Sequence, residues 1–188
     1  MGARSIAVLG AGHAGRALAG DLGRLGADVV LWNRTPDHVA EVAEQGGVDL
    51  EGEIEGFGKI RLVTSDIGEA LADTSLIMVC VPAFGHRDVA RKCAPFLRSG
   101  QMVVLNPGRT FGAIEFLHEL VTQGASDGVV VAEAGTFIFA SRSIGPAQSR
   151  INRVKRSVPV AAIPCDRTGE VIAQLEPWYP QFNPAECT

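Results

Sequence analysis

The clearest chemical pattern in the chain is Gly10-Ala-Gly12-His13-Ala14-Gly15, a G-x-G-x-x-G motif. It follows an apolar run and opens a stretch with helical spacing, the context in which this motif binds the pyrophosphate of a dinucleotide. Gly10 permits a tight turn, Gly12 lets phosphates approach the backbone, and Gly15 lets the helix pack closely on the strand. The N-terminus of the helix adds free N–H groups and partial positive charge. We therefore expect a bound dinucleotide, with His13 and Ala14 contributing through their backbone; a glycine-rich turn without a ligand is the alternative.

The end of the second strand indicates which nicotinamide nucleotide is bound. A carboxylate about 20 residues after the glycines would hold the ribose 2′-hydroxyl of NAD. The chain has Asn33-Arg34-Thr35 at this point. The guanidinium of Arg34 suits a 2′-phosphate, and Asn33 and Thr35 offer further donors. These residues favour NADP over NAD, although an arginine stacked on the adenine would fit either nucleotide.

Two more strand ends are expected at the carboxyl edge of the same sheet. Val81-Pro82 ends one apolar run and Asn106 follows the next. Ligands of open parallel sheets bind at this edge, so we expect a cofactor to contact Val81 and Pro82, and Asn106 to hold the nicotinamide ribose or carboxamide. A proline that only ends the strand is the alternative for Pro82. His86 and Arg87 are predicted to be a surface pair at the start of a helix.

Other chemistry finds little support in the sequence. It contains no G-x-S-x-G elbow, no Walker-type lysine motif and no pair of histidines at metal-ligand spacing. Hydrolase, kinase and metalloenzyme functions are therefore excluded, and we assign no metal ligand. Glu133 and Arg142 flank the last core strand and are expected to form either an interdomain ion pair or part of a carboxylate-binding surface.

The elements that must position these residues alternate between short apolar runs and longer amphipathic stretches. This alternation predicts an α/β fold, a doubly wound parallel sheet of the Rossmann type with a small β-hairpin insertion over 48–64. After Ala134 the pattern weakens, and the segments over 137–139, 142–156, 158–163 and 168–175 could extend the sheet at one edge. Strands are expected over 5–9, 27–32, 75–81, 102–105, 128–132 and 158–163. Helices are expected over 14–25, 36–45, 65–72, 87–97, 111–123 and 168–175.

The domain boundary is expected near residue 175. Residues 1–175 are predicted to form the dinucleotide-binding domain. Residues 176–185 carry three prolines and three aromatic residues, which favours a connector over 176–188 toward a second domain; a tail that covers the sheet edge is the alternative.

The composition indicates one ordinary soluble domain of 188 residues, 46% of them hydrophobic, with a net charge of −4. No basic block could follow a phosphate backbone, which argues against nucleic acid as a partner. No apolar run approaches the ~20 residues of a membrane span, and the first residues lack the features of a signal peptide. The four cysteines form no C-x-x-C pair, so we expect reduced thiols and a cytoplasmic location.

The order of these motifs resembles that of the opine (octopine/nopaline-type) dehydrogenases over essentially the whole chain. Each segment alone is moderately specific, and the glycine motif is shared by many dehydrogenases. The segments that carry the resemblance are the glycine motif, Leu50-Glu-Gly-Glu-Ile-Glu-Gly-Phe-Gly-Lys-Ile60, Val81-Pro-Ala-Phe-Gly-His86, Leu105-Asn-Pro-Gly-Arg109 through Ala113-Ile-Glu-Phe116, and Glu133 with Arg142.

The resemblance implies an NAD(P)-dependent enzyme that joins an amino acid to an α-keto acid and reduces the imine. It also implies a second, helical domain that supplies a catalytic histidine with an acidic partner. No residue of this chain matches that histidine, so the catalytic residues are unknown and the chain alone is expected to bind cofactor but scarcely turn over. Similar N-terminal domains occur in ketopantoate and glycerol-3-phosphate dehydrogenases, and a non-catalytic nucleotide-sensing module, including one that forms a homodimer, is a further alternative.

Overall fold

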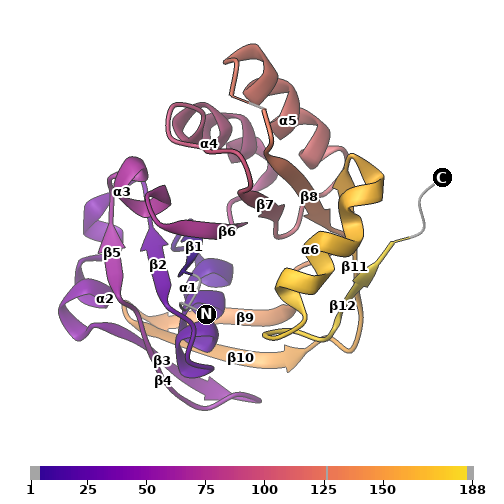
Figure 1. Ribbon diagram of the computed structural model, residues 1–188. Helices are drawn as coiled ribbons and strands as arrows, with labels where there is room; N and C mark the ends of the chain where they lie inside the picture. Colours follow the sequence, from indigo (N-terminus) through magenta and orange to yellow (C-terminus); the bar gives the residue numbers. More distant parts are fainter. Residues whose placement is uncertain (1–4, 126, 186–188) are drawn as a thin grey trace.

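The computed structural model describes residues 5–125 and 127–185, and within them the strands form two sheets (Figure 1). The main sheet has eight strands in the order β12-β11-β8-β7-β6-β1-β2-β5. The second sheet has four strands in the order β4-β3-β10-β9.

Six neighbouring strands of the main sheet run parallel, as the sequence predicted. Strands such as β1 and β7 are short apolar runs with little exposed surface, as expected for strands covered on both faces. The six are β1 (Ser5–Leu9), β2 (Val29–Trp32), β5 (Leu62–Thr64), β6 (Thr74–Val79), β7 (Met102–Leu105) and β8 (Val130–Ala134).

One edge of the main sheet departs from the predicted parallel arrangement. Strand β11 (Val158–Ile163) is antiparallel to β8, and β12 (Phe182–Pro184) runs parallel to β11. The chain reaches β11 through strands of the second sheet instead of through a crossover helix, and parallel neighbours require such a crossover. The sheet is therefore mixed.

Helices cover both faces of the main sheet, so the doubly wound prediction is confirmed. Alternate residues of β1 enter different cores: Ile6 and Val8 join one apolar cluster, and Ala7 and Leu9 join the other. Helices α1, α2 and α6 contribute to the first cluster, and α3, α4 and α5 to the second. The helices are α1 (His13–Arg24), α2 (Ala40–Gln45), α3 (Ile67–Leu71), α4 (His86–Cys93), α5 (Gly112–Thr122) and α6 (Thr168–Leu175), with 3-10 turns η1 (Pro36–His38), η2 (Ala83–Gly85) and η3 (Cys165–Arg167). The helix predicted over 36–45 is thus divided into η1 and α2.

The second sheet corrects two sequence-based predictions. Its hairpin of β3 (Gly47–Gly52) and β4 (Gly56–Lys59) was expected, but β5 leaves that hairpin and joins the main sheet beside β2. Of the segments after residue 134 that were predicted to extend the main sheet, the strand over 158–163 does so as β11, but residues 137–156 do not. Strands β9 (Phe139–Gly145) and β10 (Gln148–Val154) form a second hairpin, and β10 pairs in parallel with β3. Pairing between hairpins about 100 residues apart leaves no local signal in the sequence.

Helix α1 lies between the two sheets and contacts both (Figure 1). Glycines allow this close packing. A Cβ built on Gly58 of β4 would lie 1.7 Å from the carbonyl oxygen of Gly20, and one on Gly23 would lie 2.1 Å from that of Lys59. The second sheet therefore holds the helix that begins at the glycine motif.

The residues after α6 pack on the edge of the main sheet. Tyr179 and Phe182 are each 3% exposed, and β12 pairs with β11. The rings of Phe137, Phe139, Tyr179 and Phe182 form a chain of edge-to-face contacts. Residues 176–184 thus cover the sheet edge, which was the alternative; a connector toward a second domain stays a prediction, and 186–188 lie outside the described residues.

Cysteine pairing corrects another expectation. Cys80 and Cys93 are free, as predicted, and both are buried, whereas Cys165 is disulfide-bonded. Separation along the chain does not limit which cysteines meet in the fold, because a disulfide depends on the distance between their Cα atoms. Cys187 lies outside the described residues. None of the helices described here combines the length and apolar character needed to cross a membrane.

Candidate cofactor site

The three glycines of the motif occupy three different environments. Gly10 has a φ of +104°, and a Cβ there would lie 2.7 Å from Cγ1 of Val81. A Cβ on Gly15 would lie 1.6 Å from the carbonyl oxygen of Gly10, so α1 can approach the turn only because this residue has no side chain. Gly12 has no atom within 4 Å of its built Cβ. The space in front of Gly12, at the N-terminus of α1, is therefore free of protein atoms.

Asn33 ties this turn to the end of β2. Its Oδ1 accepts a hydrogen bond from the backbone N–H of Ala11 at 3.1 Å, and its Nδ2 donates to the carbonyl oxygen of Thr35 at 2.9 Å. The side chain therefore holds the loop in shape and keeps one amide hydrogen for any ligand. The sequence predicted Asn33 as a donor to the cofactor and did not indicate this positioning contact.

A first hollow of about 230 Å³ lies at the carboxyl ends of β1 and β2. Arg34 borders it with a side chain that is 71% exposed, and its Nη1 lies 3.5 Å from Oδ2 of Asp88 on α4. The predicted residues that line it are Gly10, Asn33, Arg34, Thr35, Val81 and Pro82, and the fold adds Trp32, His38, Phe84, Gly85, Asp88 and Val89.

A second hollow of about 430 Å³ adjoins the first, and the two share Val81 and Pro82. Together they follow the carboxyl edge of the sheet on both sides of these residues, with the glycine turn beside them. The predicted residues that line the second hollow are Gly12, His13, Ala14, Val81, Pro82 and Asn106, and the fold adds Cys80, Ala83, Pro107, Arg109 and Phe137. The structure thus brings the predicted residues to one edge, with Gly15 buried behind the turn.

His13 joins the first turn of α1 to the second sheet. Its Nδ1 accepts a hydrogen bond from the backbone N–H of Ser143 at 3.0 Å, and its carbonyl oxygen accepts one from the hydroxyl of Ser141 at 3.3 Å. The contact assigns the ring proton of neutral His13 to Nε2. Sequence reasoning missed this positioning role, because the partner residues lie about 130 positions further along the chain.

Asn106 lies almost fully buried, 1% exposed, at the end of β7. Its Nδ2 donates to the carbonyl oxygen of Val104 at 2.8 Å, while Oδ1 has no hydrogen-bond partner among the described residues. The residue lines the second hollow, so this oxygen is an acceptor that a ligand could satisfy. Burial raises the pKa of the neighbouring Cys80 thiol, which is therefore protonated at neutral pH and unsuited to act as a nucleophile.

His86 is not a surface residue, so the predicted surface pair holds for Arg87 alone, whose side chain is 52% exposed. His86 is fully buried at the start of α4, and a Cβ on Gly112 would lie 3.0 Å from its Nδ1. Desolvation lowers the pKa of the imidazole, which is therefore neutral at pH 7. The sequence predicted a surface position for His86 because it is a polar residue at the start of a helix. Residue 112 is a glycine, however, and this lets α5 pack over His86.

Glu133 stabilises the first turn of α5. Its Oε2 accepts a hydrogen bond from the backbone N–H of Ala113 at 2.8 Å, in the first turn of α5. A carboxylate at this end of a helix is favourable to the helix dipole. Arg142 lies on β9, opposite Arg150 of β10. Glu133 is therefore engaged with α5 instead of with Arg142.

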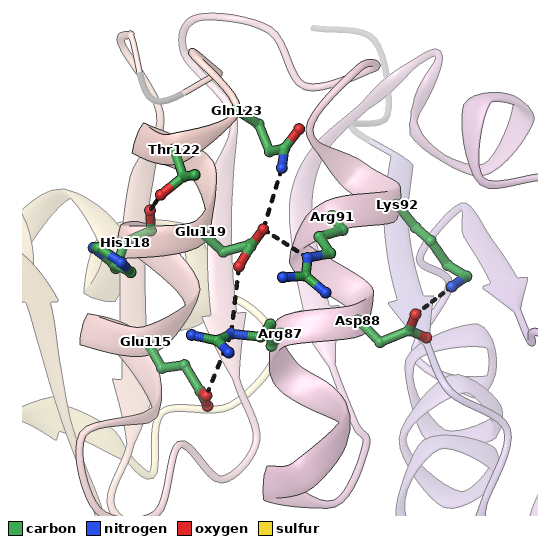
Figure 2. A network of polar contacts seen from close by, with 9 residues as sticks. All are labelled: Arg87, Asp88, Arg91, Lys92, Glu115, His118, Glu119, Thr122 and Gln123. Carbon is green, nitrogen blue, oxygen red and sulfur yellow. Dashed lines mark hydrogen bonds and ion pairs between the residues drawn. The ribbon is translucent and has the colours of Figure 1, made fainter.

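A buried carboxylate joins α4 to α5 (Figure 2). Glu119 is 3% exposed and accepts a hydrogen bond from Nε of Arg91 at 2.7 Å, while Nε of Arg87 lies 3.4 Å from its other oxygen. Gln123 donates to the same oxygen as Arg91, at 3.2 Å. The bond from Arg91 lowers the pKa of Glu119, so the group is ionised at neutral pH. This network fixes α4, which carries one wall of the first hollow.

The fold and the site together define an NAD(P)-binding domain of the dehydrogenase type. The ketopantoate reductase PanE/ApbA family matches residues 6–143, well over half of the chain, and the chain belongs to this family. Among the described residues, no group of three or more His, Cys, Asp or Glu side chains could hold a metal ion.

Relatives confirm the resemblance to opine dehydrogenases. The chain is 34% identical over 184 residues to an opine dehydrogenase of Arthrobacter sp. (strain 1C), which covers 97% of this chain and 51% of that protein. It is 30% identical over 186 residues to a glycerol-3-phosphate dehydrogenase (NAD(P)+) of Halorhodospira halophila (strain DSM 244 / SL1), covering 99% of this chain and 53% of that protein. The chain therefore spans about half the length of these relatives.

Solved structures share the fold. Octopine dehydrogenase in complex with NADH and agmatine superposes with a TM-score of 0.82 at 17% identity, covering 97% of this chain and 48% of that one. Yersinopine dehydrogenase with bound NADP+ gives a TM-score of 0.76 at 18% identity, covering 98% of this chain and 47% of that one.

Proposed function

We propose that the two hollows hold one nicotinamide dinucleotide, NADP(H) in preference to NAD(H). The pyrophosphate would lie at Gly12 and the N-terminus of α1, the adenosine end in the first hollow and the nicotinamide end in the second. The observation that carries this proposal is the contrast among the glycines. Gly10 and Gly15 are packed against protein atoms, whereas Gly12 has open space in front of exposed N–H groups.

The preference for NADP rests on the end of β2. Arg34 extends an exposed guanidinium beside the first hollow, where Thr35 adds a hydroxyl. Position 33, where NAD-binding domains of this kind hold the ribose with a carboxylate, carries an amide already engaged with the glycine turn. A 2′-phosphate could receive a charge-assisted hydrogen bond from Arg34.

The reaction we propose is that of an opine dehydrogenase. The amine of an amino acid condenses with the carbonyl of an α-keto acid and releases water; hydride from NAD(P)H then reaches the imine carbon and a proton reaches its nitrogen. Support comes from the 34% identity to the Arthrobacter protein. We assign no catalytic acid or base within this chain, and a second, helical domain would supply them. A homodimer and a cytoplasmic location stay predictions.

Reduction of ketopantoate or of dihydroxyacetone phosphate is the second candidate function. It is favoured by the match to the ketopantoate reductase family and by relatives that are glycerol-3-phosphate dehydrogenases. The same cofactor site would serve all three reactions, because the cofactor donates the hydride in each of them. The choice of substrate depends instead on the protein groups that face the cofactor.

Calorimetric titration with NADPH and NADH at one salt concentration tests the cofactor proposal. We expect NADPH to bind more tightly, and Arg34→Ala to weaken NADPH about tenfold or more, the range of one charge-assisted hydrogen bond, with little effect on NADH. Arg153→Ala, which removes a positive charge from the second sheet, is the control. If neither nucleotide binds, the proposal fails.

Oxidation of NADPH by the natural gene product that contains these residues tests the reaction. Three substrate sets are compared: amino acids with α-keto acids, ketopantoate, and dihydroxyacetone phosphate. We expect turnover only with the first set, and turnover with another set alone would replace the opine assignment. For residues 1–188 alone we expect binding with little turnover.

A further inference from the structure

We propose that Asp88 limits the preference for NADPH by opposing the 2′-phosphate at Arg34, so that NADH competes better for the same site. The inference rests on the proposed function, in which the first hollow receives the adenosine end. The sequence did not single out Asp88, because it lies 54 positions after Arg34 and on a different element.

The two charges form an ion pair at the border of the first hollow. Arg34 follows β2, Asp88 lies in the first turn of α4, and both line the hollow. Their Nη1 and Oδ2 atoms are 3.5 Å apart, with side chains 71% and 43% exposed. Any group that binds the guanidinium of Arg34 within the hollow therefore also comes near the carboxylate of Asp88.

Asp88 is held in its charged form. A hydrogen bond from Lys92, one turn further along α4, lowers the pKa of the carboxyl group, and Arg34 contributes in the same direction. Figure 2 shows Asp88 and Lys92 on the side of α4 opposite to the network around Glu119. Asp88 can therefore be altered without removing a contact that joins α4 to α5.

The carboxylate affects the two nucleotides differently. NADPH places a phosphate near Arg34, and its negative charge is repelled by Asp88 at a separation of a few ångströms. NADH has a neutral hydroxyl at the same carbon of the ribose, which is not repelled. Because Asp88 lies beside both Arg34 and Lys92, the field there is less positive than that of the two cations alone, so Asp88 reduces the advantage that Arg34 gives to NADPH.

Titration of Asp88→Asn with both nucleotides at low salt tests the proposal. Because asparagine keeps the shape and removes the charge, we expect the Kd for NADPH to fall about five- to tenfold while the Kd for NADH changes less than about twofold. The gain in affinity for NADPH should shrink as the salt concentration rises to about 1 M. Asp88→Glu keeps the charge and should retain the natural preference. Glu55→Gln removes a negative charge from the exposed β3–β4 turn and should leave both constants unchanged.

The outcomes separate this proposal from the cofactor assignment. If both nucleotides bind and Asp88→Asn leaves the ratio of their constants unchanged, Asp88 has no role in specificity although the cofactor site stands. If Asp88→Asn weakens NADH and leaves NADPH unchanged, the carboxylate acts as a ribose acceptor and the repulsion argument is wrong. If the natural chain binds neither nucleotide, the cofactor assignment itself fails. Thermal unfolding of each variant shows that the titrated protein is folded.

Discussion

Replacing Gly12 and Gly15 in turn by alanine separates the two reasons for a glycine in this motif. Gly12 has a φ of −75° and no atom within 4 Å of a built Cβ, so alanine fits both the backbone and the protein. Gly15 would place its methyl group 1.6 Å from the carbonyl oxygen of Gly10. We expect Gly12→Ala to lose cofactor binding in a folded protein, and Gly15→Ala to lose stability.

The expected magnitudes follow from these distances. At Gly12 the methyl group occupies the space next to the backbone N–H groups, and displacing a phosphate by about 1 Å would break one or two charge-assisted hydrogen bonds worth about 1.5–3 kcal/mol each. The Kd should therefore rise at least about tenfold. The free energy of unfolding should change by about 1 kcal/mol or less, the effect of alanine at a helix N-cap. At Gly15 the contact is with backbone, so overpacking should cost about 1–3 kcal/mol or more.

Two assays on the same preparations measure these effects. Calorimetric titration with NADPH gives the Kd, and urea unfolding without nucleotide gives the free energy of unfolding. Gly169→Ala is a control, because Gly169 also has no atom within 4 Å of a built Cβ but lies on α6, away from the two hollows. It should leave the Kd nearly unchanged and raise the free energy of unfolding by no more than about 1 kcal/mol, because alanine favours a helix over glycine.

Two results would refute the reasoning. If Gly12→Ala binds NADPH as tightly as the natural chain does, the phosphates do not approach this residue. That result would remove the observation on which the cofactor proposal rests. Equal loss of stability in Gly12→Ala and Gly15→Ala would mean that the space in front of Gly12 is occupied in solution.

Three further predictions concern packing and titration. Gly58→Ala should lower the free energy of unfolding by about 1–3 kcal/mol in the same urea assay, because its methyl group would lie 1.7 Å from the carbonyl oxygen of Gly20; an unchanged value would contradict the close packing of α1 on β4. Glu119→Gln should lower the Tm at pH 7. Because the folded pKa of Glu119 is lowered, the stability that its carboxylate contributes is present above about pH 4.5 and is lost as the group is protonated at lower pH. The difference in Tm between the natural chain and Glu119→Gln should therefore shrink in acid, and a difference that grew would contradict this prediction. Burial raises the pKa of Cys93 to about 12, so a thiol reagent at pH 8 should modify this residue only after unfolding, and rapid modification of the folded chain would show that α4 opens.

Much of the main sheet follows from local sequence. The predicted strands over 5–9, 102–105 and 158–163 and the helix over 168–175 have the bounds of β1, β7, β11 and α6. Burial of continuous apolar runs, ended by glycine, proline or polar residues, is a local property, which explains this agreement. The sequence predicted the β3–β4 hairpin of the second sheet but not its pairing with the β9–β10 hairpin, because the central pair joins β3 to β10 across about 100 residues.

The sequence by itself determined the glycine turn at the start of α1, the run of polar residues after β2 and the strand ends that meet at one sheet edge. Each depends on residue type and short-range spacing. Only the tertiary structure decided that Asn33 supports the turn, that His86 is buried beneath Gly112, and that Asp88 faces Arg34. These roles arise between elements that are distant in the chain, and the packing of those elements, which no local pattern encodes, sets the distances on which charge and hydrogen bonding depend.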